Sequence, residues 1–132
     1  MSIDVILEDQ RWKPLLRAIE QAGDATLVHL QLDPSEWDVT ILGCNDARIA
    51  ELNEDFREKR APTNVLSWPS QERGADIEGA RPQAPKGDSE LGDIAISYDT
   101  CQNEAESGSI PLENHTIHLV VHGVLHFWAT IT

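Results

Sequence analysis

Four histidines in the last quarter of the chain have the spacing of residues on one face of a helix. His115, His118, His122 and His126 recur at intervals of three and four residues, and at about 100° per residue they fall within an arc of about 80°. Imidazoles four residues apart can reach one metal ion, because they lie one above the other on the helix. His122 can pair with His118 or with His126, but not with both on one ion, since those two are about 12 Å apart along the axis.

The residues between these histidines are mostly apolar, so the helix should be buried on its other side. We therefore predict a central, buried C-terminal helix over residues 111–128 whose histidines face a cleft. Gly123 follows His122, at the position where His-Glu-x-x-His proteases carry their general base. The spacing thus favours a two-histidine half-site and argues against that protease mechanism.

The remaining elements follow from hydrophobic periodicity and turn residues. The helix that starts at Trp12 should stop at Gly23, and the next one, capped by Asn45 or Asp46, should end near Arg60. Residues 70–90, rich in proline and glycine, are predicted to form a flexible loop. Strands are expected over 3–7, 26–32, 38–42, 64–68 and 91–97, and helices over 12–22, 45–60, 98–107 and 111–128.

Length and composition favour one cytoplasmic domain. A chain of 132 residues with 40% hydrophobic residues is long enough for one core, so residues 1–132 are predicted to form a single domain. No apolar stretch approaches the roughly 20 residues that cross a bilayer. The acidic N-terminal segment lacks the basic and apolar parts of a signal peptide. Cys44 and Cys101 have no metal-binding spacing and are expected to be buried or free thiols.

The charge distribution points to one place where a polyanion could bind. The formal net charge of −13 argues against a general nucleic-acid binder. Arg57, Lys59 and Arg60 nevertheless form a basic cluster, and no Lys or Arg follows Lys86. The cluster is the candidate phosphate contact, although cations at a helix end are equally explained by the helix dipole.

Several stretches together resemble the YbeY family of endoribonucleases, the bacterial rRNA maturation factors. Each stretch is weak alone, but their order and spacing over about residues 45–126 are specific. They are Leu52-Asn53 with Phe56-Arg57, Pro62-Thr-Asn-Val-Leu-Ser-Trp-Pro69, Leu91-Gly-Asp-Ile94, and residues 118–126 with the core Val-Val-His-Gly-Val-Leu-His.

The resemblance implies an α+β fold, in which a small mixed sheet of about four to five strands packs against helices. It also implies one zinc ion held by three histidines, with His122 and His126 as the first two ligands and His118 as a neighbour. The third ligand of the family pattern falls at Thr132, and the family continues with a further helical stretch. The resemblance therefore predicts a metal site that lacks one ligand, whether through truncation, a frame change or divergence.

The resemblance further assigns Arg57 a catalytic role, as a guanidinium that holds phosphate oxygens. It implies a zinc-dependent, single-strand-specific endoribonuclease of rRNA maturation and ribosome quality control, with rRNA and the ribosome as partners. Asp93 and Asn64 either orient groups around the site or are ordinary strand-end residues. Two alternatives remain open: a non-catalytic relative that binds RNA or the ribosome, and a metal-dependent hydrolase of another substrate.

Overall fold

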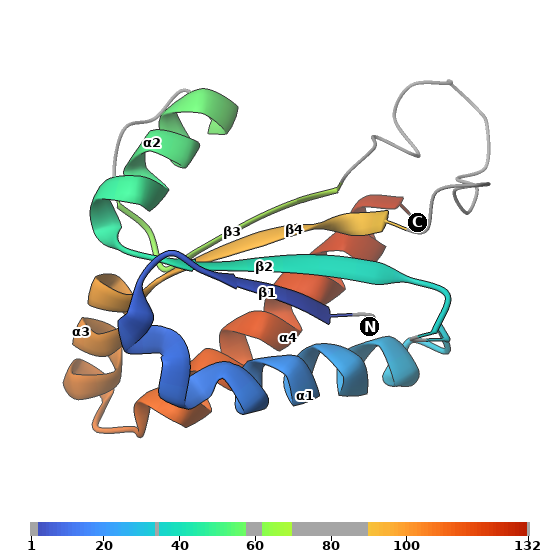
Figure 1. Cartoon of the computed structure of the whole chain (residues 1–132), viewed down its shortest axis with the longest axis horizontal. Coiled ribbons are helices and arrows are strands. Elements are labelled where there is room, and N and C mark those ends of the chain that lie inside the picture. Colours follow the sequence, from blue (N-terminus) through green and yellow to red (C-terminus); the bar gives the residue numbers. More distant parts are fainter. Residues whose placement is uncertain (1–2, 34, 58–61, 70–89, 132) are drawn as a thin grey trace.

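The computed structural model describes residues 3–33, 35–57, 62–69 and 90–131, without the side chains of residues 56, 57, 69, 90 and 128–131. In the described part of the chain, strands and helices follow in the order β1, η1, α1, β2, α2, β3, β4, α3 and α4 (Figure 1). The strands are β1 (Ile3–Leu7), β2 (Asp38–Cys44), β3 (Val65–Pro69) and β4 (Glu90–Ser97). The helices are the 3₁₀ helix η1 (Gln10–Leu15), α1 (Leu16–His29), α2 (Asp46–Arg57), α3 (Tyr98–Gly108) and α4 (Leu112–Ile131).

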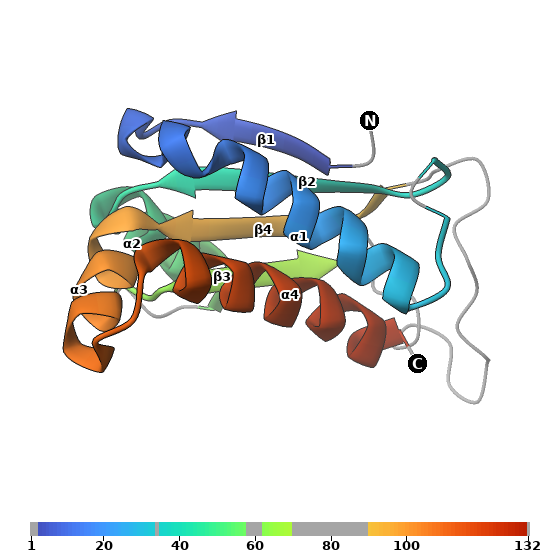
Figure 2. The same cartoon turned by 90° about the horizontal axis from the view of Figure 1, so that it is seen from below.

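The four strands form one mixed sheet in the order β1-β2-β4-β3. β1, β2 and β4 are parallel, and the edge strand β3 is antiparallel to β4. Helices α1 and α4 lie side by side under one face of the sheet, α2 lies over the other face, and α3 lies at one end (Figures 1 and 2). This arrangement confirms the predicted small mixed sheet packed against helices.

The core is divided by the sheet into two parts. The larger part lies between the sheet and α1 and α4, where Trp12, Ile19, Ile94, Val120 and Phe127 are fully buried. The smaller part lies under α2 and is built on Cys44, Ile49, Leu52, Leu66 and Ala95. Burial of each large apolar side chain contributes about 1.5–3 kcal/mol, so the sheet is held from both faces.

The predicted end of the first long helix is wrong. Helix α1 continues through Gly23 to His29, so the expected strand over 26–32 does not form. Gly23 marks a close approach instead of a stop, because a Cβ there would lie 2.6 Å from Cδ1 of Ile3 in β1. Leu27, further along α1, is fully buried, and this burial outweighs the β propensity of the segment.

The other predicted elements are confirmed to within a few residues. Asn45 caps α2, since its side-chain oxygen accepts a hydrogen bond from the Arg48 N–H at 2.9 Å. The expected helix end at Arg60 and the expected loop over 70–90 fall almost wholly on residues outside the described part. No helix in the described part of the chain is long and apolar enough to cross a membrane.

Candidate functional site

Helix α4 presents its histidines on the face opposite the core. Val120, Val124 and Phe127 are fully buried against the sheet, whereas His122 and His126 are exposed. The predicted buried central helix is therefore buried on one side only. Figure 2 shows α4 running under the β3 side of the sheet, so its exposed face lies at the margin of the molecule.

The histidines of this face have different surroundings. His115 is half-buried, and its Nε2 lies 2.8 Å from Oε1 of Glu104 in α3. His118 and His122 are both exposed, and their rings stack with centroids 6.3 Å apart and planes 23° apart. The structure therefore separates one histidine that joins two helices from the exposed ones that a ligand can reach.

His122 and His126 fit one edge of a tetrahedral zinc ion, because they stand one turn apart on an exposed helix face. Among the described residues, however, no group of three or more His, Cys, Asp or Glu side chains is placed to hold a metal. Thr132, the position of the third family ligand, lies outside the described residues. The described part of the chain thus offers two imidazoles that could bind zinc, one fewer than a catalytic zinc site takes.

Asp93 lies on the other face of the sheet from α4. It pairs with Trp68 of β3 in the ladder, and Trp68 packs against the small core under α2. The neighbouring residue Gly92 faces α4, because a Cβ added there would lie 2.7 Å from Phe127. Successive strand residues point to opposite faces of the sheet, so the Asp93 side chain points away from α4. Burial raises the pKa of the Asp93 carboxyl, and a hydrogen bond from Trp68 opposes that rise. Asp93 therefore does not join the histidines.

Asn64 has structural partners in α3. Its side-chain amide donates to Oε1 of Glu104 at 3.0 Å, and its carbonyl accepts a hydrogen bond from the Ser97 N–H at 3.0 Å. Because Glu104 also contacts His115, these residues connect the start of β3 with α3 and α4. These contacts favour the interpretation of Asn64 as a structural residue at a strand end.

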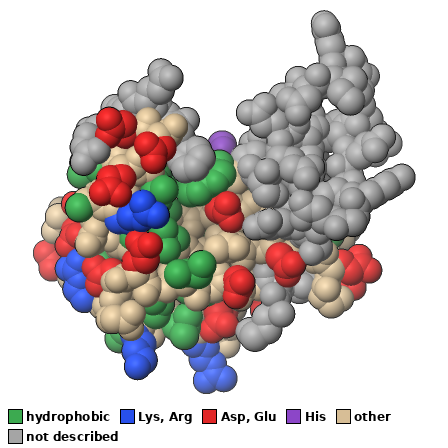
Figure 3. All heavy atoms as spheres, turned by 45° about the horizontal axis from the view of Figure 1, so that its top comes forward, with side chains coloured by type: hydrophobic (Ala, Val, Ile, Leu, Met, Phe, Trp, Pro, Cys, Tyr) green, Lys and Arg blue, Asp and Glu red, His purple; other side chains and the backbone are tan. Residues whose placement is uncertain are grey.

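Arg57 is the last residue of α2, on the face of the sheet opposite α4. Its side chain, and Lys59 and Arg60 altogether, lie outside the described residues. On the face shown in Figure 3, acidic side chains are spread over the described surface and a histidine shows only at the rim.

Comparison with known proteins identifies the family. The family model for endoribonuclease YbeY matches residues 5–129. The chain belongs to the YbeY family. The endoribonuclease YbeY of Ruegeria sp. (strain TM1040) is 52% identical over 132 residues, which cover 96% of this chain and 78% of that protein. That of Ruegeria pomeroyi is 48% identical over 130 residues, which cover 96% and 79%.

The YbeY fold is also seen in a solved structure. The solution structure of a Thermotoga maritima protein superposes with a TM-score of 0.61 and 22% sequence identity, covering 95% of this chain and 71% of that one. At this identity the likeness concerns the fold alone.

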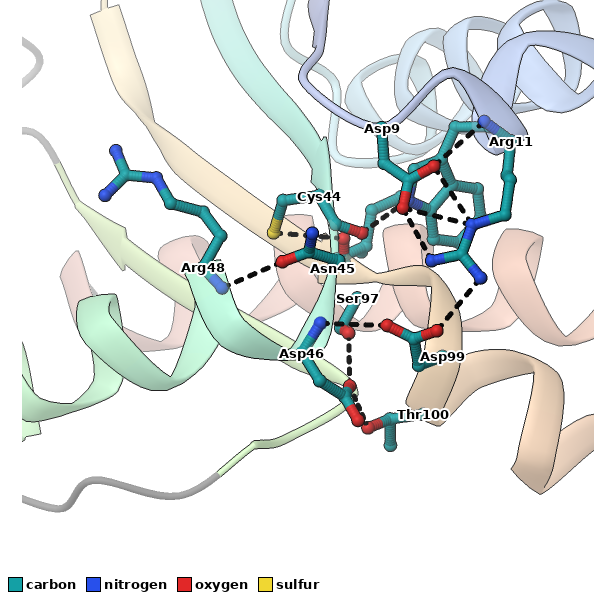
Figure 4. Close-up of polar contacts among 11 residues, drawn as sticks. Asp9, Arg11, Cys44, Asn45, Asp46, Arg48, Ser97, Asp99 and Thr100 are labelled. Atoms are coloured by element: carbon teal, nitrogen blue, oxygen red, sulfur yellow. Dashed lines mark hydrogen bonds and ion pairs between the residues drawn. The ribbon is translucent and has the colours of Figure 1, made fainter.

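In this YbeY-family chain, the carboxyl ends of the parallel strands carry a polar network that the sequence did not reveal (Figure 4). Arg11 bridges Asp9 and Asp99, with nitrogen–oxygen distances of 2.6 and 2.9 Å, and its guanidinium lies 4.4 Å from the centroid of the Tyr98 ring. The signal available in the sequence was the polar run after each of the three parallel strands.

The second half of this network joins the first turns of α2 and α3. Asp46 accepts hydrogen bonds from the hydroxyls of Ser97 and Thr100 at 2.5 and 2.7 Å. The Asp46 N–H in turn donates to Asp99 at 3.1 Å. Both carboxylates lie at helix N-termini, where negative charge is favourable. The network therefore has a structural role, which is to join the first turns of α2 and α3.

The Arg11 bridge gives a prediction about pH. Hydrogen bonds from Arg11 hold the pKa of the Asp9 and Asp99 carboxyls below the ordinary 3.8. Arg11→Gln should therefore raise both pKa values, which carboxyl NMR titration measures. A lowered carboxyl pKa stabilises the fold above the unfolded-state pKa, and that contribution is lost as pH falls through the folded-state pKa.

The stability difference between the unaltered chain and Arg11→Gln should thus be present at pH 7 and shrink below about pH 4. Arg17→Gln is the matched control, since Arg17 is also exposed but belongs to none of the contacts of this network. A difference that is unchanged between pH 7 and pH 3 would show that the bridge does not act through the carboxylates.

The two cysteines match their expected structural role. Cys44 and Cys101 are free and fully buried. Burial is the main cause that raises the pKa of each thiol to about 12, which leaves both protonated at neutral pH. Neither cysteine is thus suited to act as a nucleophile or a metal ligand.

Proposed function

We propose that this chain is a metal-dependent endoribonuclease that cleaves single-stranded RNA and acts in rRNA maturation and ribosome quality control in the cytoplasm. Membership of the YbeY family, whose curated relatives are named endoribonucleases, is the main support. The observation that carries the metal-dependent part is the exposed pair His122 and His126 on α4. A zinc ion bound there would polarise a phosphoryl oxygen of the RNA backbone.

In this proposal, some residues bind the RNA and others hold the helix that carries the histidines. Arg57 would hold phosphate oxygens through its guanidinium. The buried side of α4 fixes the backbone that carries the histidines, because Val120, Val124 and Phe127 pack against the sheet. Glu104 and Asn64 hold α3, α4 and the start of β3 together. RNA is thus proposed to bind along the exposed face of α4 and to pass the edge strand β3 to reach Arg57 at the end of α2, on the other face of the sheet.

Cleavage of an end-labelled RNA tests the proposal. The chain should cut a single-stranded RNA internally and leave a duplex of the same sequence intact. EDTA and His122→Ala should each reduce cleavage to background. His29→Ala is the control, because His29 is an exposed histidine at the end of α1, away from this face.

Other outcomes would favour the alternatives. RNA binding without cleavage would indicate the non-catalytic relative. Cleavage that is insensitive to both EDTA and His122→Ala would contradict the metal-dependent part of the proposal.

A further inference from the structure

The exposed face of α4 differs in charge from the rest of this acidic protein. The chain has 23 Asp and Glu residues, yet none occurs from Asn114 to Thr132, and that segment also lacks Lys and Arg. Among the described side chains of this segment, the exposed polar ones are Asn114 and the imidazoles of His118, His122 and His126. After Glu113 in the first turn, α4 carries no carboxylate, so an RNA backbone approaching the part with His118, His122 and His126 meets less of the repulsion that a net charge of −13 creates elsewhere.

His118 is the exposed histidine on this face that the proposed metal pair, His122 and His126, does not use. It is exposed, and within the described part of the chain it has no hydrogen bond or ion pair; its contact is the ring stack with His122. His115, by contrast, is engaged by Glu104. His118 cannot share an ion with both His122 and His126, because about 12 Å of helix separates it from His126.

The position of His118 places a hydrogen-bond donor beside the proposed metal pair. Its ring centroid lies 6.3 Å from that of His122, and the two rings are nearly parallel. A neutral imidazole keeps one N–H donor. A hydrogen bond from this donor to a phosphate is strengthened by the negative charge of the phosphate. A phosphate next to one held at His122 would therefore lie within reach of His118.

Resting on the function proposed above, we infer that His118 is a substrate-contacting residue. Its ring N–H donates a hydrogen bond to a phosphate oxygen of single-stranded RNA, next to the phosphate that is cleaved. The contact positions the strand along α4 and serves RNA binding more than the chemical step.

Two substitutions separate this role from the alternatives. His118→Phe keeps a flat ring and removes the donor, whereas His118→Gln keeps a donor and removes the ring. RNA affinity, measured by fluorescence anisotropy in EDTA, should fall about tenfold for His118→Phe, since a hydrogen bond to a charged group contributes roughly that factor or more. His118→Gln should recover part of it, and His29→Phe should leave it unchanged.

In cleavage, His118→Phe should raise KM about tenfold and change kcat less, with zinc stoichiometry and circular dichroism unaltered. The inference is overturned if His118→Phe binds RNA as tightly as the unaltered chain, which would indicate base stacking or no contact. It is also overturned if His118→Phe loses zinc, which would make His118 a ligand. Cleavage that is independent of His118 but lost in His122→Ala would overturn this inference alone, whereas absence of both RNA binding and cleavage would overturn the proposed function as well.

Discussion

Trp12→Ala should lower the free energy of unfolding by about 3–5 kcal/mol, as removal of a fully buried tryptophan does. Trp12 is completely buried, its indole N–H donates to the carbonyl of Cys44 at 3.1 Å, and its ring meets that of Tyr98 edge-on at 5.2 Å. Alanine would leave a cavity between η1 and the sheet and an unpaired carbonyl at the end of β2. A loss of this size is a large part of the 5–15 kcal/mol that stabilises a typical domain.

Urea unfolding followed by far-ultraviolet circular dichroism measures this loss without depending on the tryptophan that is removed. Trp37→Ala is the matched control, because Trp37 is only partly buried at the margin of the larger core. Trp37→Ala should lower the free energy of unfolding by clearly less than Trp12→Ala does. Equal effects of the two substitutions would show that Trp12 does not anchor η1 and the end of β2.

Arg57→Ala should reduce RNA cleavage by about 100-fold or more, the usual effect of removing a group that stabilises developing charge at a reacting centre. The free energy of unfolding should change little, since an ion pair made by a helix-end arginine contributes about 0–1 kcal/mol. Arg17→Ala is the control, because Arg17 is an exposed arginine on α1. Unfolding of Arg57→Ala, or unchanged cleavage, would contradict the catalytic assignment.

Much of the fold was predictable because local signals and tertiary packing agreed. The strands β1, β3 and β4 and the helices α3 and α4 lie close to their expected ranges, since apolar periodicity there coincides with burial. Gly23 is the instructive failure. A glycine near a helix end resembles a stop signal, and only the tertiary contact with Ile3 shows that this one permits close packing.

The candidate site was predictable in part. The spacing of His118, His122 and His126 placed them on one helix face, and the structure exposes all three. The spacing could not show that His115 is engaged by Glu104, because the two belong to different helices. The Arg11 network was missed for the same reason, since its members meet only when parallel strands end at one edge of the sheet.

Zinc titration against a chromophoric chelator tests the central claim, that His122 and His126 form one edge of a metal site. The unaltered chain should bind one zinc ion weakly, His122→Ala and His126→Ala should abolish binding, and His29→Ala should leave it unchanged. Thr132→His should tighten binding, since it adds a third imidazole at the position where the family pattern has one. Zinc binding that persists unchanged in His122→Ala and His126→Ala would contradict the account.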